Sequence, residues 1–253
     1  MIEESVFDKY SQYYDLLYGD KDYDAETAYV NELLSRHGVD KGEVLEFGSG
    51  TGRHGTLLAG LGHTVFGVER SQEMVNRSRS APRFSCTQGD ITSIDLGQTF
   101  DAVLALFHVV SYQTQTRDVL AVFENAFRHL RPGGIFAFDY WYSPAVAEIR
   151  PSVRVKRVRD ANYSVTRVAE PRIKANENIV EVGYTVFAEE IDQGTIESFE
   201  ELHSMRHFSL PEILQLASVT GFEHVASAEF LTGNEPGADT WGVCTVLRKP
   251  GEL

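Results

Sequence analysis

The stretch "VLEFGSGTGRHG", from Val44 to Gly55, places a glycine-rich turn directly behind a short apolar run. Such a turn between a strand and a helix lets a ligand approach the backbone closely, and the helix N-terminus supplies free N–H groups. Gly50, Gly52 and Gly55 match the dinucleotide spacing G-x-G-x-x-G, provided that the strand ends later than Phe47. The loop alone therefore leaves a nicotinamide nucleotide and other nucleotide ligands open.

The carboxylates around this loop favour a ligand that carries an α-amino group. Glu46 lies inside the expected strand, where it would repel a pyrophosphate and attract an ammonium group. No Lys-Ser or Lys-Thr follows the loop, which excludes a P-loop. Glu69 ends the next apolar run, where a carboxylate can bind both hydroxyls of a ribose. Two local alternatives remain: Glu69 could cap the helix after Ser71, and Asp90 could cap the turn after "TQG".

Apolar runs of strand length alternate with helical patterns from residue 43 onward. The runs are "EVLEF", "HTVFGVE", "RFSCTQ", "FDAVLALF" and "GIFAFDY". The segment "TRDVLAVFENAFRHLRPGG" between the last two has helical spacing, and its Pro-Gly-Gly is expected to stop the helix and turn the chain into the next strand. This alternation predicts an α/β fold with a doubly wound, mostly parallel, seven-stranded sheet.

Four regions are expected along the chain. They are a helical N-terminal region (1–38), a nucleotide-binding core (39–150), an antiparallel β insertion (151–207) and a C-terminal helix with the last strands (208–253). The period-two pattern of Val182, Tyr184 and Val186 indicates the strands of the insertion. Ser209 and Glu212 form a possible capping box for the last helix. The runs "FEHVASAEFL" and "TWGVCTVLRK" are expected to return to the sheet as edge strands.

Composition narrows the class of protein. A chain of 253 residues that is 42% hydrophobic can bury a large core. Its net charge of -14 disfavours a dedicated nucleic-acid binder. No apolar run approaches the roughly 18 residues of a membrane span, and the first residues hold no apolar leader, so a cytoplasmic monomer or homodimer is predicted. The histidines are scattered and no metal-ligand spacing is recognised, and Cys86 and Cys244 are expected to be buried free thiols.

The order of the motifs adds a family resemblance. "VLEFGSGTG", "VFGVER", "QGDI", "FDAVLALFHVVSY" and "LRPGGIFAFD" closely resemble the class I S-adenosylmethionine-dependent methyltransferases over roughly residues 40 to 140. The resemblance implies S-adenosylmethionine as cofactor and S-adenosylhomocysteine as product. It also implies that the loop wraps the methionine portion while Glu69 binds the ribose. The cofactor-binding residues expected from these motifs are Glu46, Gly48, Ser49, Gly50, Glu69, Arg70, Asp90, Ile91, Leu106 and Phe107.

A tyrosine stripe precedes the core in "YSQYYDLLYGDKDY". Tyr10, Tyr14 and Tyr18 have four-residue spacing and share one helix face, with Tyr23 after a glycine turn. Such a stripe is most often packing. The resemblance makes this helix a lid over the cofactor, which implies Tyr18 near the sulfonium, Tyr23 at the cofactor carboxylate and Tyr14 at the substrate.

Methyl transfer requires alignment of the nucleophile with the methyl group and removal of one proton. "HVVSYQ" places His108 and Tyr112 on the loop after the fourth run. By resemblance, Tyr112 stands where several relatives have a histidine that accepts the proton. A tyrosine accepts protons poorly, so either Tyr112 orients the acceptor, or His108 takes the proton, or His108 is a neutral strand-end residue in a hydrogen bond. The catalytic candidates are thus Tyr18, His108 and Tyr112.

The insertion concentrates basic charge. Residues 151–175 hold seven basic side chains against two acids, and residues 176–201 hold eight acids and no base. This pattern indicates a salt-paired hairpin, a site for an anionic substrate, or both. Together with "FDYWYSP" and "EELHSMRHFS", it resembles N-methyltransferases of nucleotide-linked amino sugars, of the desosamine and mycaminose type. The substrate contacts that this implies are Tyr14, Tyr140, Trp141, Tyr142, Arg167 and Arg206.

Two other functions remain open at this point. One is an O-methyltransferase, or an enzyme acting on another small metabolite, with the same cofactor site. The other is a protein that binds S-adenosylmethionine without turnover, because a fold alone does not establish a reaction.

Overall fold

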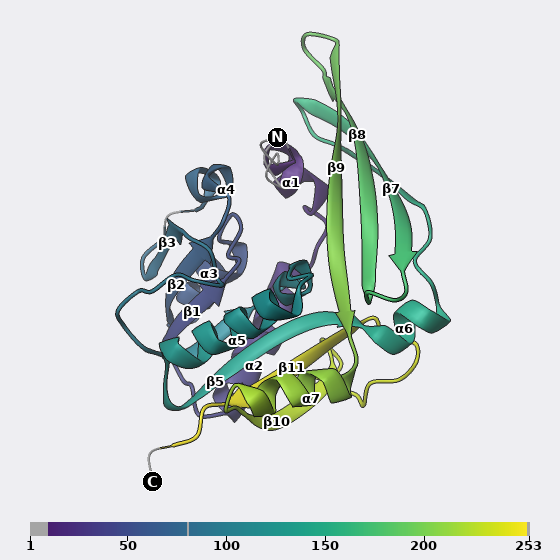
Figure 1. Ribbon diagram of the computed structural model, residues 1–253. Helices are drawn as coiled ribbons and strands as arrows, with labels where there is room; N and C mark the ends of the chain where they lie inside the picture. Colours follow the sequence, from purple (N-terminus) through teal and green to yellow (C-terminus); the bar gives the residue numbers. More distant parts are fainter. Residues whose placement is uncertain (1–9, 80, 252–253) are drawn as a thin grey trace.

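The computed structural model describes residues 10–79 and 81–251, and Figure 1 shows an α/β core from which a long antiparallel sheet projects. The first part of the expected N-terminal region, residues 1–9, lies outside the described residues. The helices are α1 (Ser11–Leu17), α2 (Tyr23–Arg36), α3 (Arg53–Gly60), α4 (Gln72–Arg77), the 3-10 turn η1 (Val109–Tyr112), α5 (Thr116–His129), α6 (Ser143–Glu148) and α7 (Leu210–Val219). The strands are β1 (Glu43–Phe47), β2 (Thr64–Glu69), β3 (Phe84–Gln88), β4 (Phe100–Ala105), β5 (Leu130–Tyr142), β6 (Arg154–Arg159), β7 (Tyr163–Lys174), β8 (Ile179–Glu190), β9 (Thr195–Phe208), β10 (Glu223–Glu229) and β11 (Gly242–Arg248).

The core sheet has the order β3-β2-β1-β4-β5-β11-β10, which gives the expected seven strands. Strands β1 to β5 are parallel, while β11 is antiparallel to β5 and β10 is antiparallel to β11. The expectation of two edge strands is thus wrong for β11, which lies between β5 and β10. Its side chains explain the difference, because Val243, Val246 and Leu247 are all buried and suit an interior strand.

The antiparallel sheet β6-β7-β8-β9 is a continuation of the core sheet. The long strand β5 passes beyond the end of β4, and there Trp141 and Tyr142 pair with His207 and Phe208 of β9 in parallel. Trp141 also pairs with Gly242 of β11, so the end of β5 is hydrogen-bonded to two sheets. One strand therefore fixes how the projecting sheet stands on the core (Figure 1).

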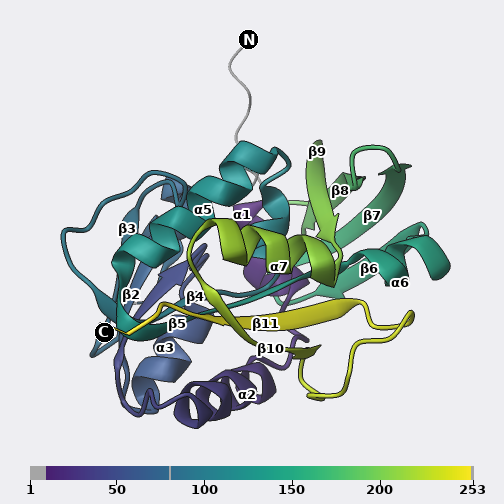
Figure 2. The same ribbon diagram turned by 60° about the horizontal axis from the view of Figure 1, so that its bottom comes forward.

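Helices cover both faces of the core sheet (Figure 2). On one face, α5 and α7 pack their apolar sides on an aromatic cluster that includes Phe123, Phe136 and Phe138. On the other face, α2 and α3 contribute buried residues such as Leu34 and Leu58. Helix α1 packs elsewhere, with Tyr13 and its neighbours on the inner face of β7 and β8.

Two local sequence signals act differently from expectation. Helix α5 ends at His129, before the Pro-Gly-Gly, and residues 131–134 form an irregularity inside β5 between the pairs Phe100↔Leu130 and Ala102↔Ile135. The capping box is absent, because the Ser209 side chain makes no cap bond although α7 begins directly after it. Glu212 accepts a hydrogen bond from Arg206 instead, since that charged partner binds it more strongly than a backbone N–H.

Two findings concern the described part of the chain as a whole. Cys244 is buried and Cys86 is partly exposed, and both are free thiols. Within residues 10–79 and 81–251, no helix combines the length and the apolar character that a membrane crossing requires.

The glycine loop between β1 and α3 depends on left-handed backbone. Gly48 and Ser49 donate to the carbonyl of Val68, and this bonding folds the loop back over the end of β2. Gly50 has φ +55° and Gly52, the N-cap of α3, has φ +76°. A side chain at either position is strained, because L-residues rarely adopt this region.

We predict that Gly52→Ala destabilises the fold more than Gly50→Ala. A Cβ atom at Gly52 would lie 2.5 Å from the ring of buried Phe84, whereas a Cβ atom at Gly50 would meet nothing within 4 Å. Gly50→Ala should lower the free energy of unfolding by about 1–2 kcal/mol through backbone strain, and Gly52→Ala by about 1–3 kcal/mol more through overpacking. Urea titration of both variants measures this, and equal losses would contradict the close packing on Phe84.

Candidate functional site

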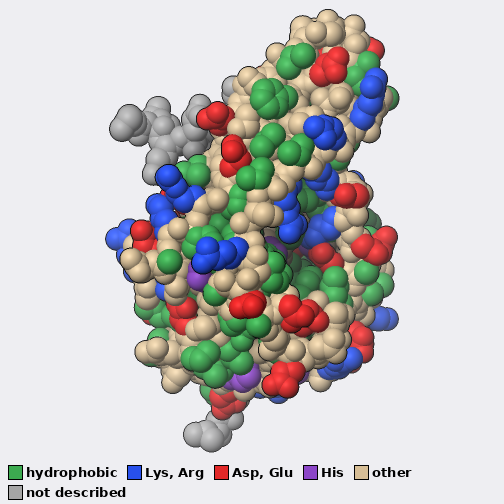
Figure 3. Space-filling model, turned by 90° about the vertical axis from the view of Figure 1, so that its right-hand side faces the viewer, with side chains coloured by type: hydrophobic (Ala, Val, Ile, Leu, Met, Phe, Trp, Pro, Cys, Tyr) green, Lys and Arg blue, Asp and Glu red, His purple; other side chains and the backbone are tan. Residues whose placement is uncertain are grey.

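A cavity of about 1360 Å³ lies between the carboxyl ends of the parallel strands, α1 and the inner face of the projecting sheet. Figure 3 shows the hollow where the projecting sheet meets the core, with basic side chains gathered around it. We call the wall formed by the glycine loop, Glu69, Asp90 and residues 106–108 the loop side, and the wall formed by Trp141, Arg150, Arg154, Arg167 and Tyr184 the sheet side.

The structure brings most of the predicted residues to this one cavity. On the loop side and under α1 the predicted residues that line it are Tyr14, Tyr18, Tyr23, Gly48, Ser49, Gly50, Glu69, Arg70, Asp90, Ile91, Leu106, Phe107, His108 and Tyr112. On the sheet side they are Trp141 and Arg167. This placement follows from topology, because the carboxyl ends of parallel strands meet at one edge of the sheet.

Glu69 joins the end of β2 to the glycine loop. Its Oε2 accepts a hydrogen bond from Gly50 N at 2.9 Å, and its Oε1 accepts one from Ser71 N at 2.9 Å. Ser71 itself caps α4 through Met74 N, so Glu69 is not needed as the helix cap. Burial raises the pKa of Glu69 above its usual value, and the backbone N–H groups oppose this rise.

Asp90 forms the turn that the sequence left as an alternative. Its Oδ1 accepts hydrogen bonds from Thr92 N at 2.8 Å and from Thr92 Oγ1 at 2.6 Å. The residue also lines the cavity beside Ile91. Turn capping and a ligand contact are therefore compatible at this position, since a carboxylate has several acceptor sites.

Glu46 lies behind the loop and not in the cavity wall. Burial, with a further contribution from the nearby charge of Glu69, raises the pKa of Glu46 to about 8. Its Oε2 has no hydrogen-bond partner among the residues that the structure describes. This oxygen lies beside Gly55 behind the loop, so the structure does not bring Glu46 to the cavity with the other predicted cofactor contacts.

The tyrosine stripe is both packing and cavity wall. Tyr10 is fully buried, with its ring stacked on Tyr184, whereas Tyr14 and Tyr18 line the cavity. Arg167 of β7 donates from Nη1 to Tyr10 Oη at 2.6 Å and to Tyr18 Oη at 3.1 Å. The residue expected to contact a substrate thus also fastens α1 to the projecting sheet.

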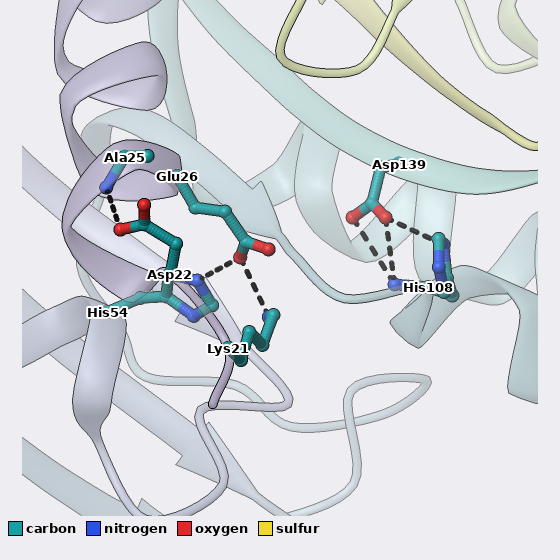
Figure 4. Close-up of polar contacts among 7 residues, drawn as sticks. All are labelled: Lys21, Asp22, Ala25, Glu26, His54, His108 and Asp139. Atoms are coloured by element: carbon teal, nitrogen blue, oxygen red, sulfur yellow. Dashed lines mark hydrogen bonds and ion pairs between the residues drawn. The ribbon is translucent and has the colours of Figure 1, made fainter. Parts of the chain in front are cut away.

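A cluster of charged side chains that the sequence did not predict lies near the start of α2 (Figure 4). Lys21 Nζ is 2.7 Å from Glu26 Oε2 and 3.6 Å from the centre of the Phe107 ring. His54 Nε2 lies 2.8 Å from the same Glu26 oxygen. Burial lowers the pKa of Lys21 although Glu26 opposes this. The Lys21 ammonium therefore lies between the Glu26 carboxylate and the ring of Phe107.

His108 is held by a buried carboxylate on β5 (Figure 4). Its backbone N donates to both Asp139 oxygens at 3.2 Å, and its Nδ1 lies 2.7 Å from Asp139 Oδ2. Burial alone would raise the pKa of Asp139, but the His108 ring and backbone outweigh it and the pKa is lowered. Because His108 also lines the cavity, this arrangement is compatible with both predicted alternatives, a base and a hydrogen-bonded residue after a strand.

Tyr112 is bonded to a histidine that the sequence analysis did not identify. Tyr112 Oη lies 3.0 Å from His203 Nδ1, and His203 Nε2 lies 3.2 Å from Glu201 Oε2. Glu201 Oε1 accepts from Tyr10 N at 3.0 Å. The period-two pattern of a strand could have identified Glu201 and His203 as neighbours, because residues 201 and 203 lie on one face of β9.

Three residues predicted to contact the substrate, Tyr140, Tyr142 and Arg206, lie away from the cavity. Tyr140 is fully buried and its Oη lies 3.3 Å from Thr245 Oγ1, while Tyr142 packs on the aromatic core. Successive residues of β5 point to opposite faces, so of these neighbours only Trp141 reaches the cavity. Arg206 forms an ion pair with Glu212 at 2.6 Å and is not in the cavity wall.

The sheet side contains further residues that the site prediction omitted. Arg150, Arg154, Tyr184 and Trp241 line it with Trp141. Arg154 belongs to the basic segment seen in the sequence, and strand alternation on β6 directs it differently from Arg157. Among the described residues, no cluster of three or more histidine, cysteine or acidic side chains could hold a metal ion.

Comparisons with known proteins agree with this geometry. The profile of a methyltransferase domain matches residues 44–134. The chain is 29% identical over 245 residues to the putative methyltransferase YqeM of Bacillus subtilis (strain 168), covering 93% of this chain and 94% of that protein. It is also 29% identical to the dTDP-3-amino-3,4,6-trideoxy-alpha-D-glucopyranose N,N-dimethyltransferase of Streptomyces venezuelae, covering 88% and 92%.

A solved structure shares the fold across the whole chain. The sugar N-methyltransferase KedS8 from Streptoalloteichus sp ATCC 53650 superposes with a TM-score of 0.82 at 20% identity, covering 100% of this chain and 96% of that one. The domain match and the relatives cover the glycine loop and the strands that end at the cavity. The chain is therefore an S-adenosylmethionine-dependent methyltransferase with the class I fold.

Proposed function

We propose that this enzyme methylates the amino group of a nucleotide-linked amino sugar. The observation that carries the proposal is one continuous cavity with a loop side and a basic, aromatic sheet side. Pockets for one small molecule measure about 300–1,000 Å³. A volume of about 1360 Å³ therefore accommodates the cofactor together with a sizeable acceptor.

The loop side suits the cofactor. We assign the ribose to Glu69, the adenine to the wall of Arg70, Asp90 and Ile91, and the amino acid portion to the loop around Gly48 and Gly50. The bound cofactor supplies a methyl group on a cationic sulfur. Aromatic rings attract such a cation, and the ring of Tyr18 lines the cavity beside Phe107.

The sheet side suits an anionic sugar nucleotide. Arg150 and Arg154 line it, and a guanidinium binds phosphate oxygens with two parallel hydrogen bonds. Trp141 and Tyr184 provide flat apolar surfaces of the kind that bind sugar rings. Three relatives are named as N,N-dimethyltransferases of dTDP-linked amino sugars, at 28–30% identity, which supports the same substrate class here.

An amine acceptor also fits the polar groups at the reaction centre. A sugar hydroxyl needs a strong general base or a metal ion, whereas an amine needs only a modest proton acceptor. Tyr112 is one of the hydroxyl groups that line the cavity, and burial raises its pKa. A neutral phenol can orient an amine by hydrogen bonding without becoming a base itself.

We predict that Glu69→Ala lowers the affinity for S-adenosylmethionine by about 10²-fold, because it removes a charged acceptor for the ribose and the support for Gly50 N–H. Isothermal titration calorimetry measures the affinity. Glu69→Gln keeps the size of the side chain and should show a smaller loss. Unchanged affinity in a folded Glu69→Ala protein would contradict the placement of the cofactor at this loop.

Incubation with UDP- and dTDP-linked amino and neutral sugars should give mass gains of one or two methyl groups on the amino sugars alone. The reason is the amine preference of a site with only modest proton acceptors. Mass spectrometry reads the result. Gains on neutral sugars alone would replace the proposal with an O-methyltransferase.

Arg154→Ala should raise the KM for the nucleotide-linked acceptor about 10-fold or more and leave the KM for the cofactor unchanged, because one charge-assisted phosphate contact is lost. Arg157→Ala is the matched control, since Arg157 lies on the same strand but outside the cavity wall. Steady-state kinetics compare the two variants. Equal effects would show that general positive charge, and not a contact, is responsible.

A further inference from the structure

Tyr112, His203 and Glu201 form a buried chain of hydrogen bonds that ends at the cavity. Tyr112 is the member that lines the cavity, while His203 is only 2% exposed. The links measure 3.0 Å from Tyr112 Oη to His203 Nδ1 and 3.2 Å from His203 Nε2 to Glu201 Oε2. The three residues come from η1 and β9, so the fold assembles them from segments 91 residues apart.

The carboxylate fixes the direction of the hydrogen bonds. An ionised carboxylate only accepts, so the imidazole presents N–H to Glu201 from Nε2. Nδ1 then carries the lone pair and accepts the hydrogen of the Tyr112 hydroxyl. In this arrangement the phenol hydrogen points to His203, and the phenol oxygen is oriented to accept a hydrogen bond from a group in the cavity.

We propose that Tyr112 and His203 are a proton relay that deprotonates the acceptor ammonium, with Glu201 as the residue that positions the imidazole. The inference rests on the proposed function, because it needs an amine acceptor. An N–H bond of the ammonium breaks and its electron pair stays on nitrogen as the nucleophile. The proton forms a new bond to Tyr112 Oη, and the original phenol hydrogen passes to His203 Nδ1.

The charge balance of this step favours the relay over a phenolate. One positive charge moves from the acceptor nitrogen to the imidazole, where the Glu201 carboxylate stabilises it, and the imidazolium later returns the proton to solvent. Burial and the neighbouring tyrosines raise the pKa of Tyr112, which disfavours an ionised phenol. The relay leaves Tyr112 neutral before and after transfer, so this rise does not oppose it.

Several elements place titratable or charged side chains around His203. Among the described groups, Tyr184 of β8 faces it at a ring distance of 4.6 Å and Tyr10 at the start of α1 faces it at 5.6 Å. Arg167 of β7 lies over Tyr184 at 4.8 Å and donates to Tyr10 Oη. The Glu201 carboxylate therefore contacts the imidazole directly, whereas the Arg167 guanidinium contacts Tyr184 and Tyr10.

The other candidate base is placed differently. His108 Nδ1 and backbone N are directed to Asp139, which holds the ring at the end of β4. A carboxylate at Nδ1 orients the ring and leaves Nε2 as the nitrogen that accepts a proton, so His108, which also lines the cavity, is the competing base. The relay proposal places proton transfer on Tyr112 and His203 because a hydrogen bond joins them at the cavity. If His108 were the base, Tyr112→Phe and His203→Gln would show no pH-dependent deficit.

The test is the pH dependence of methyl transfer to the amino sugar nucleotide that the wild-type enzyme accepts, for Tyr112→Phe, His203→Gln and Glu201→Gln. General base catalysis contributes about 10²-fold or more, so Tyr112→Phe and His203→Gln should lower kcat/KM by about 10²-fold near pH 7. The deficit should shrink to a few-fold near about pH 9.5, where an amine beside electron-withdrawing groups, such as an α-amino group, is already neutral in solution. Glu201→Gln should show a smaller deficit with the same convergence.

His207→Gln is the matched control, since His207 lies on the same strand but bonds to Ser143. It should retain the wild-type profile. Thermal unfolding and S-adenosylmethionine affinity verify that each variant is folded, and Tyr112→Phe removes a single oxygen. A deficit in Tyr112→Phe and His203→Gln that stays constant with pH, or no deficit at all, would overturn the relay and leave the proposed function intact. A wild-type enzyme that methylates no amine would overturn both.

Discussion

One strand, β5, pairs with strands of both the core sheet and the projecting sheet, and the position of the cavity depends on this pairing. Strand β5 runs through the core and then pairs with β9, so the loop side and the sheet side of the cavity share a single hydrogen-bonded backbone. Asp139 and Trp141 lie two residues apart on that strand, and the first holds His108 while the second lines the sheet side. The distance between the two sides is consequently set by strand geometry and not by a flexible linker.

Helix α1 and the residues that flank it are attached to the projecting sheet more than to the core. Arg167 bonds Tyr10 and Tyr18, Lys156 forms an ion pair with Asp20 at 2.6 Å, and Glu201 accepts from Tyr10 N. The exposed pair contributes little by itself, but the buried bonds are costly to break because they would leave polar groups unpaired. Both covers of the cavity, helix and sheet, therefore form one unit.

The parts predicted from the sequence were those fixed by local pattern. Alternating strands and helices gave the parallel core, and the positions of Gly48 and Glu69 at strand ends placed them at one cavity. Predictions failed where a distant partner decides a side chain. Arg206 was expected at a substrate but pairs with Glu212, and the same pairing removes the capping box. Tyr112 was identified without His203, because no local signal joins residues so far apart.

Glu201 takes part in two separate hydrogen bonds, one with each carboxylate oxygen. One oxygen accepts a hydrogen bond from Tyr10, the residue before α1, and the other lies against the imidazole behind Tyr112. Any movement of α1 that breaks the first bond alters the field at the second, and thermodynamic linkage makes the influence mutual. The contact that holds the residue before α1 and the contact that holds the imidazole thus share one carboxylate, so a change at either one alters the electrostatic surroundings of the other.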